Sequence, residues 1–272
     1  MGPLEAIILV AVGFGIGAYS AAVGAGGGFL VAPLLLIRYP DAEPAAITTA
    51  SLTVVLATSV SQMVLASRER RVDFPVVLAM AVVAIPAALF GAIGTTWLPR
   101  EVFALGFAVL ITGIAIYVLA NPTAGIAPPF AGRVWERDRT DARGDRYLYR
   151  IPIVRSVVPN ILSASLSAMA GIGGGPIGIP LMTRVMRVPH ALAVPSMHAL
   201  IMLQSAVVVS FHLVLGHEGD PMNDVPWLAA GVILAAAPGR WLRLRLGEGP
   251  LMQGLALGLF VVAARTAWGA FQ

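Results

Sequence analysis

The residues that could bind a ligand are concentrated in two glycine-rich segments. Residues 20–28 read Ser-Ala-Ala-Val-Gly-Ala-Gly-Gly-Gly, and residues 167–175 read Ser-Ala-Met-Ala-Gly-Ile-Gly-Gly-Gly. Their glycines are Gly24, Gly26, Gly27 and Gly28 in the first segment and Gly171, Gly173, Gly174 and Gly175 in the second. Glycine adopts positive φ angles readily and lets the backbone approach a partner closely. We therefore expect each segment to interrupt a helix.

Each expected break lies directly before a short apolar run, and this placement favours an anion site. Pro176 suits the first position of a helix, where an N–H group has no partner within the helix. The free N–H groups and the dipole make this end of a helix positive. Two such ends near the membrane midplane could bind a small anion without a buried arginine. Tight helix packing through small residues is the alternative, and it suits spaced glycines such as Gly13, Gly15 and Gly17 better.

Small polar residues begin the long apolar run that follows each short one. The spacing that relates the glycine segments also pairs Thr49 with Ser196 and Ser51 with His198. Their hydroxyl groups could donate to an anionic oxygen, or they could make ordinary hydrogen bonds between helices, worth about 0.6 kcal/mol each. His198 could bind the anion or carry a coupling proton, and a neutral packed histidine is the competing interpretation.

Other polar residues contribute less to a site. Asn160 and Gln204 are weaker candidates for a polar pathway, and His190, His212 and His217 lie near the ends of apolar runs without metal-ligand spacing. The chain contains no cysteine, and no aspartate or glutamate lies well inside an apolar run. The glycines are not followed by the lysine that a phosphate-binding loop requires. We expect no metal, no cofactor and no enzymatic activity.

Composition indicates where these segments lie. Hydrophobic residues make up 58 % of the 272 residues and charged residues only 12 %, whereas a soluble domain carries roughly 25 % charge. Such a chain has too little polar surface to cover a soluble protein, so we expect an integral membrane protein surrounded by lipid. The net charge of +4 comes from arginines between apolar runs, which act as topology signals and do not indicate a nucleic-acid partner.

Ten apolar runs follow one another along the chain. They cover residues 4–23, 29–37, 46–66, 74–98, 102–120, 151–170, 176–186, 191–215, 225–242 and 251–270. Eight of them are long enough to span a membrane as helices. The two short runs, 29–37 and 176–186, would be about 14–17 Å long as helices and would reach only halfway across. The first two runs of each half could both cross the membrane as helices. Alternatively, they could form a helical hairpin with the glycine segment at its tip.

The loops differ in charge between the two halves. Residues 67–73, 121–150 and 239–249 are rich in arginine and are expected in the cytoplasm. Residues 216–224 carry three acidic residues and no arginine, so this loop is expected outside. Because the basic loop at 67–73 corresponds to the acidic loop at 216–224, the halves should have opposite orientation. Both termini are then external.

These patterns predict an all-α polytopic membrane protein built from two inverted-topology repeats of five helical segments each. The second segment of each repeat is a half-length helix after a glycine-rich break. Residues 1–120 form the first repeat, residues 121–150 a cytoplasmic, solvated linker, and residues 151–272 the second repeat.

The two motifs resemble those of a known family. Residues 24–33, Gly-Ala-Gly-Gly-Gly-Phe-Leu-Val-Ala-Pro, and residues 171–180, Gly-Ile-Gly-Gly-Gly-Pro-Ile-Gly-Ile-Pro, are similar to the paired motifs of the sulfite exporter TauE/SafE family, also called the toluene-sulfonate uptake permease family. The resemblance covers nearly the whole chain. It implies a transporter of the bacterial inner membrane for sulfite, organosulfonates or small organic acids. The family commonly has a sequence similar to Thr-Ser-Leu after each motif, and both Thr49-Ala-Ser51-Leu52 and Ser196-Met-His198-Ala199 depart from it.

Together these features predict a secondary transporter (permease) that binds a small anion at both breaks and works by alternating access. Transport could be coupled to protons or to the membrane potential, and the chain could form an oligomer of identical subunits. A passive anion channel is the main alternative, and an intramembrane enzyme is a remote one because His198 has no evident catalytic partner.

Overall fold

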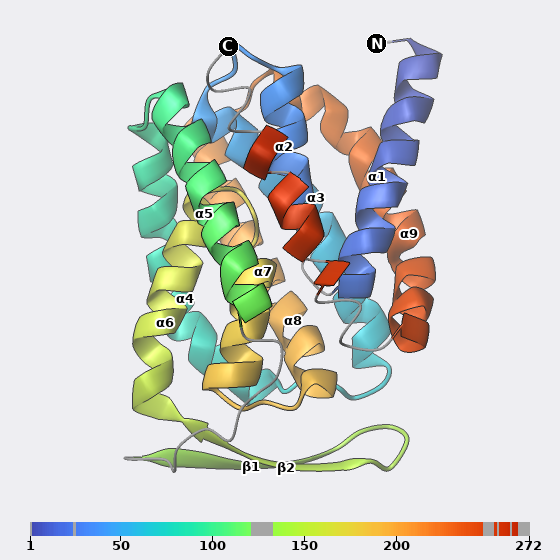
Figure 1. The fold of residues 1–272 in the computed structure, drawn as a ribbon, viewed down its shortest axis with the longest axis vertical. Helices are drawn as coiled ribbons and strands as arrows, with labels where there is room; N and C mark the ends of the chain where they lie inside the picture. The colour runs from blue at the N-terminus through green and yellow to red at the C-terminus, as the bar shows by residue number, and fades with distance from the viewer. Residues whose placement is uncertain are drawn as a thin grey trace.

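The computed structural model describes residues 2–23, 26–120, 133–246, 253–254, 256–261 and 263–265. In these ranges the helices form a bundle, with a two-stranded hairpin across one end (Figure 1). The helices are α1 (Pro3–Val23), α2 (Gly28–Arg38), α3 (Pro44–Ser67), α4 (Phe74–Thr96), α5 (Arg100–Ala120), α6 (Ile153–Met169), α7 (Gly175–Pro180), the π-helix η1 (Leu181–Val185), α8 (His190–Val214), the 3₁₀ turn η2 (Asp220–Asp224) and α9 (Val225–Leu246).

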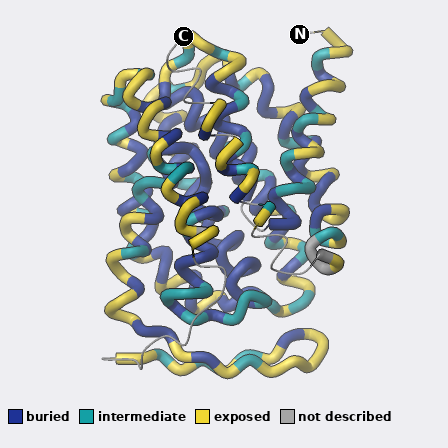
Figure 2. The backbone as a smooth tube through the Cα atoms, in the orientation of Figure 1, coloured by how far each residue is buried: buried dark blue, intermediate teal, exposed yellow. Residues whose placement is uncertain are grey.

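Six helices of the described chain are long and apolar enough to cross a membrane: α1, α3, α4, α5, α8 and α9. Eight spans were expected. The run at 151–170 forms the 17-residue α6, because its first residues belong to a strand, and the run at 251–270 lies partly outside the described residues. Buried residues fill the interior of the bundle, and exposed residues lie on its outside (Figure 2). The exposed residues include large apolar ones such as Val82, Phe90 and Val109. The chain is therefore a multi-pass, mostly helical membrane protein.

The expectation of an all-α chain with a solvated linker at 121–150 needs correction in the second part of that linker. Strands β1 (Val134–Thr140) and β2 (Arg146–Pro152) pair antiparallel, with Val134 opposite Pro152 and Thr140 opposite Arg146. Side chains alternate along β2, so that Tyr149 is buried against the bundle while its neighbours face solvent. The linker residues 121–132 lie outside the described residues.

The first two helical segments of each half begin and end at the same end of the bundle. Glu5 near the start of α1 forms an ion pair with Arg38 at the end of α2, so α2 returns to the end of the bundle where α1 begins. The start of α1 lies opposite the β hairpin (Figure 1). In the second half, α6 begins directly after β2, and Arg187, just beyond η1, lines a surface hollow with the strand residues Arg137 and Tyr149.

Spaced glycines allow helices to pack in backbone contact. α1 packs against α9, α4 against α6, and α3 against α8. A Cβ atom on Gly13 would lie 2.5 Å from the carbonyl oxygen of Leu228 in α9, and one on Gly91 would lie 2.1 Å from that of Ser165 in α6. Gly17 meets α9 in the same way, whereas a Cβ on Gly15 would meet nothing within 4 Å. Close packing therefore explains some of the spaced glycines, as the alternative interpretation held.

Candidate functional site

The two glycine segments adopt the same backbone conformation. Gly26 and Gly27 have φ angles of 76° and 84°, and Gly173 and Gly174 have 73° and 84°. Gly27 is the N-cap of α2 and Gly174 that of α7, both in the left-handed region. A residue with a Cβ atom pays roughly 1–2 kcal/mol for this conformation, which accounts for the glycines. Gly171 also has a positive φ of 68°, while Gly24 lies outside the described residues.

The two breaks lie against each other in the interior. A Cβ atom on Gly28 would be 2.7 Å from the carbonyl oxygen of Ile172, so only glycine permits this approach. The hydroxyl of Ser51 in α3 donates to the carbonyl oxygen of Gly171 at 2.7 Å and so ties α3 to the second break. The structure thus brings together both glycine segments and Ser51.

Each break presents the first N–H groups of a helix. The amides of Leu30 and Val31 both donate to the carbonyl of Gly27, and the amide of Gly178 donates to that of Gly174 at 2.6 Å. The amides before these positions have no partner further back in the helix, as at any helix start. They belong to Gly28 and Phe29 in the first half and to Gly175 and Ile177 in the second, since Pro176 has no N–H.

Two serines that open the repeated segments lie beside the breaks and were missed as candidates. The hydroxyl of Ser20 donates to the carbonyl of Ile16 at 2.5 Å and would lie 3.0 Å from a Cβ on Gly27. The equivalent Ser167 lies 3.7 Å from the Cβ position of Gly174, and its buried hydroxyl has no hydrogen-bond partner among the described residues. Their position at the start of each repeated segment was the available signal.

Thr48 is a second buried hydroxyl next to the second break. Its Cα lies 3.1 Å from the Cβ position of Gly171, and its oxygen also has no hydrogen-bond partner. Thr48 and Ser51 are three residues apart and therefore share one face of α3. This face, rather than that of Thr49, contacts the break.

Thr49 and Ser196 lie at opposite ends of the bundle, away from each other. The hydroxyl of Thr49 contacts Nδ1 of His212 at 2.9 Å, near the end of α8. The hydroxyl of Ser196, near the start of α8, accepts from the backbone N–H of Asp73 at 2.9 Å. Because α3 and α8 run in opposite directions, residues that correspond in the two halves are far apart here.

The remaining candidates have different surroundings. Gln204 lies beside the second break, with its Oε1 atom 3.6 Å from the Cβ position of Gly174. His198 is buried and donates from Nδ1 to the carbonyl of Val194 at 2.9 Å. Asn160 donates from its side chain to the carbonyl of Met80 at 3.1 Å and so joins α6 to α4.

Two buried aspartates were also missed, although they stand in a repeated motif. Asp73 precedes α4 in Asp-Phe-Pro, and Asp224 precedes α9 in Asp-Val-Pro, 151 residues further on. Asp73 accepts hydrogen bonds from Arg137 at 2.6 and 3.1 Å and from the hydroxyl of Tyr149. Asp224 accepts from Arg38 at 2.6 Å, and its other oxygen, Oδ1, has no partner. Each end of the bundle therefore contains a buried aspartate that directly precedes a helix and is paired with arginine.

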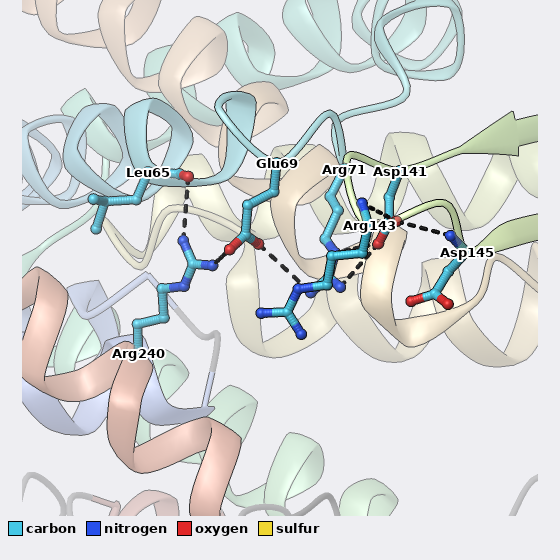
Figure 3. A network of polar contacts seen from close by, with 7 residues as sticks. All are labelled: Leu65, Glu69, Arg71, Asp141, Arg143, Asp145 and Arg240. Carbon is cyan, nitrogen blue, oxygen red and sulfur yellow. Dashed lines mark hydrogen bonds and ion pairs between the residues drawn. The ribbon is translucent and has the colours of Figure 1, made fainter.

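Hairpin residues join the ion pairs at their end of the bundle. Arg240 contacts Glu69, Glu69 contacts Arg71 at 3.5 Å, and Arg71 contacts Asp141 at 2.9 Å (Figure 3). Burial alone would raise the pKa of Asp141, but its hydrogen bonds with Arg71 and two backbone amides hold the pKa below its usual value. Burial raises the pKa of Tyr149, and its hydrogen bond with Asp73 raises it further, so this phenol stays neutral. These contacts fasten the hairpin to the loop between α3 and α4.

Comparisons with known proteins agree with this architecture. Residues 9–266 match the family model described as Sulfite exporter TauE/SafE. The chain is 25 % identical over 248 residues to the "Probable membrane transporter protein YunE" of Bacillus subtilis (strain 168), over 89 % of this chain and 86 % of that protein. No solved structure matches it. Because the family model covers nearly the whole sequence, this chain belongs to the sulfite exporter TauE/SafE family of membrane transporters.

Proposed function

We propose that this chain is a secondary transporter that carries a small anion, such as sulfite, an organosulfonate or a small organic acid, across the bacterial inner membrane. The observation that carries the proposal is the contact between two helix breaks of the same conformation, Gly28 against Ile172. Both breaks direct the positive end of a helical segment into the interior. The family membership is consistent with an anionic cargo, since the family's name refers to sulfite.

Backbone amides and hydroxyl groups bind the anion in this proposal. The amides are those at the starts of α2 and α7, and α7 continues directly into η1 as one helical segment. Ser167 and Thr48 supply a second reason to place a ligand here, because both are buried hydroxyls without a partner. A buried hydroxyl without a hydrogen bond is unfavourable, and an anionic oxygen would relieve it. Gln204 and His198 are further members of the proposed polar pathway.

Alternating access follows from an inverted repeat, which the helix contacts support. If the first five segments correspond to the last five, α1 corresponds to α6 and α4 to α9. Under this correspondence, the packing of α1 against α9 is equivalent to the packing of α6 against α4. Both contacts are extensive. The shared Asp-x-Pro motifs and the equal φ angles of the breaks fit the same correspondence. Rocking of one repeat against the other would expose the breaks to each side in turn.

The arginine-rich hairpin end is the cytoplasmic end in this proposal, following the excess of basic residues in cytoplasmic loops. The opposite end, where α1 begins, then faces outward. A hollow of about 520 Å³ at this end is lined by Asp41, Glu43, Glu218 and Asp220 together with Arg38. The two ends therefore differ in charge as the loop sequences predict.

Counterflow in proteoliposomes tests the proposal. Purified protein is reconstituted into vesicles loaded with unlabelled sulfite, and ³⁵S-sulfite is added outside. A carrier exchanges the two and accumulates label transiently above equilibrium, whereas a passive channel equilibrates label without overshoot. Overshoot is the expected result. Label that merely equilibrates, with a conductance in planar bilayers, would identify a channel instead.

A further inference from the structure

His212 is a buried titratable group that the proposed anion site does not use. It lies near the end of α8 and is fully buried. Its Nδ1 atom is 2.9 Å from the hydroxyl oxygen of Thr49 in α3, and its Nε2 atom is 3.3 Å from the carbonyl oxygen of Ala92 in α4. The hydroxyl of Thr49 also lies 2.7 Å from the carbonyl oxygen of Ala45. One imidazole ring therefore links three helices.

Counting hydrogens shows that these distances fit two protonation states of His212. The carbonyl oxygens of Ala92 and Ala45 only accept, so the contact with Ala92 needs a hydrogen on Nε2 of His212. In the first state, Thr49 donates its single hydrogen to Ala45. The contact between Thr49 and Nδ1 then requires a hydrogen on Nδ1 as well. A ring with hydrogens on both nitrogens is an imidazolium cation. A neutral ring keeps the bond to Ala92 but accepts at Nδ1, so that Thr49 must turn away from Ala45.

We infer that His212 is the proton-binding site that couples proton movement to anion transport, an inference that rests on the proposed function. The proton adds to Nδ1, and the hydroxyl of Thr49 turns from Nδ1 to the carbonyl of Ala45. Deprotonation reverses both changes. The ring thus has two states, each with its own hydrogen bond from α3.

The proton can arrive from the hollow at the outward end. His217 lines this hollow, and its ring packs edge-on against the ring of His212 at 5.8 Å between centroids. Helix α3 contacts the His212 ring with the hydroxyl of Thr49, and α4 contacts it with the carbonyl of Ala92, and neither group titrates. Among the described residues, His217 is therefore the titratable side chain in contact with His212. The carboxylates that line the hollow produce a negative potential, which raises the local concentration of protons.

Both helices that contact His212 also contact the second glycine break. Two residues beyond Thr49 in α3, Ser51 donates to the carbonyl of Gly171 at 2.7 Å. Three residues beyond Ala92 in α4, Thr95 donates to the carbonyl of Met169 at 3.0 Å, directly before the break. A change in the hydrogen bonds of His212 therefore acts on the two helices that hold this break.

Ring NMR tests the proton site without any transport assay. The full-length protein, labelled with ¹⁵N-histidine in lipid nanodiscs, is titrated through the range of pH 5 to 8 in which histidine ordinarily changes charge, and His212→Gln assigns the resonance. We expect both ring nitrogens to become protonated at the acidic end. Thr49→Val should alter this titration and Thr49→Ser should restore it. Thr53→Val is the matched control, because Thr53 bonds only to the carbonyl of Thr49 one turn away. Ring shifts of His212 that do not change with pH would overturn the inference.

Sulfite flux in proteoliposomes, with a pH-sensitive dye inside, tests the coupling. Wild-type protein should show proton movement with sulfite and a rate that changes by about fivefold or more across this pH range. His212→Gln should keep sulfite exchange but lose both effects, while His190→Gln at the other end of α8 keeps them. Thr49→Val and Thr49→Ser provide the same comparison if His212→Gln does not fold. Wild-type pH dependence in a folded His212→Gln or Thr49→Val protein contradicts the inference. If wild-type protein moves no sulfite, the proposed function fails, and the ring titration alone decides whether His212 binds a proton.

Discussion

The two glycine breaks share a backbone conformation but differ in what surrounds them. In the first break, the neighbouring Ser20 is satisfied by its own helix, and α2 continues as a regular helix to Arg38. In the second break, Ser167 has no partner, and α7 passes after six residues into the π-helix η1. Short π-helical turns are frequent at functional sites. Equal glycine spacing therefore produces the same local geometry without the same chemistry.

This difference suggests that the two breaks contribute different groups to anion binding. The first break provides helix amides within a satisfied surrounding, whereas the second adds two free hydroxyls and a carbonyl held by Ser51. An anion that lies between them would gain most of its side-chain contacts from the second half. The following predictions test this asymmetry, beginning with the change that affects both breaks.

The largest effect should come from Gly28→Ala, which separates the breaks. The new Cβ atom would lie 2.7 Å from the backbone of Ile172 and 2.6 Å from a methyl group of Val55. We expect sulfite flux to fall by at least about tenfold, since a misplacement near 1 Å at a site can reduce its activity about 100-fold. Gly106→Ala is the control, because a Cβ there meets nothing within 4 Å. Normal flux in Gly28→Ala would show that the close contact of the breaks is not required.

Ser51→Ala should have the next largest effect, because it releases the carbonyl of Gly171. Loss of this buried hydrogen bond should lower the free energy of unfolding by about 1 kcal/mol and also reduce flux. Ser61→Ala is the matched control on the same helix, because Ser61 bonds to the carbonyl of Ala57 in its own helix. Thermal denaturation and flux, measured on both variants, separate stability from transport. Equal sulfite flux in the two variants would show that the hydrogen bond of Ser51 is not required for transport.

Ser167→Ala and Ser20→Ala compare the breaks directly. A hydrogen bond to a charged group contributes roughly 1.5–3 kcal/mol, so loss of the Ser167 hydroxyl should weaken sulfite affinity about tenfold or more. Stability should stay nearly unchanged, because this hydroxyl has no hydrogen-bond partner in the described part of the chain. Ser20→Ala should change affinity less than about twofold. Thermal-shift titration with sulfite measures both variants, and equal losses would mean that the two halves contribute alike.

Acidification should have the smallest effect on stability and should act first at the β hairpin. Hydrogen bonds keep the pKa of Asp141 below its usual value, so its contribution to stability is present at neutral pH and is lost as the pH falls through that lowered pKa. Hydrogen exchange should therefore show the hairpin amides loosening at acidic pH before those of α2 and α7. Loosening of α2 or α7 before the hairpin would contradict this order.

The sequence predicted the helices and breaks well because their signals are local. Helices α4 and α9 begin at the expected Phe74 and Val225, since apolar runs bounded by polar residues determine where spans start. Positive φ angles occur at five of the predicted glycines because few other residues adopt them, namely at Gly26, Gly27, Gly171, Gly173 and Gly174. The β hairpin was missed because its many charges indicated a solvated linker, although the alternation around Tyr149 is typical of a strand.

The partners of individual side chains could not be predicted in the same way. Thr49 was grouped with Ser51, yet adjacent faces of α3 direct the first to His212 and the second to Gly171. Which neighbour meets each face depends on packing between helices that are distant in sequence. Asp73 and Asp224, in contrast, could have been found from their repeated Asp-x-Pro motif.

Sulfite counterflow with Gly27→Leu and Gly174→Leu tests the central claim, that the two breaks bind the anion, most directly. Both residues are helix N-caps with φ angles of 84°, so a leucine disturbs the helix start in each half. Gly15→Leu is the control, since that position is open. The account predicts loss of counterflow in both N-cap variants and normal counterflow in the control, all in monodisperse, folded protein. Unchanged counterflow in folded Gly27→Leu and Gly174→Leu would contradict it.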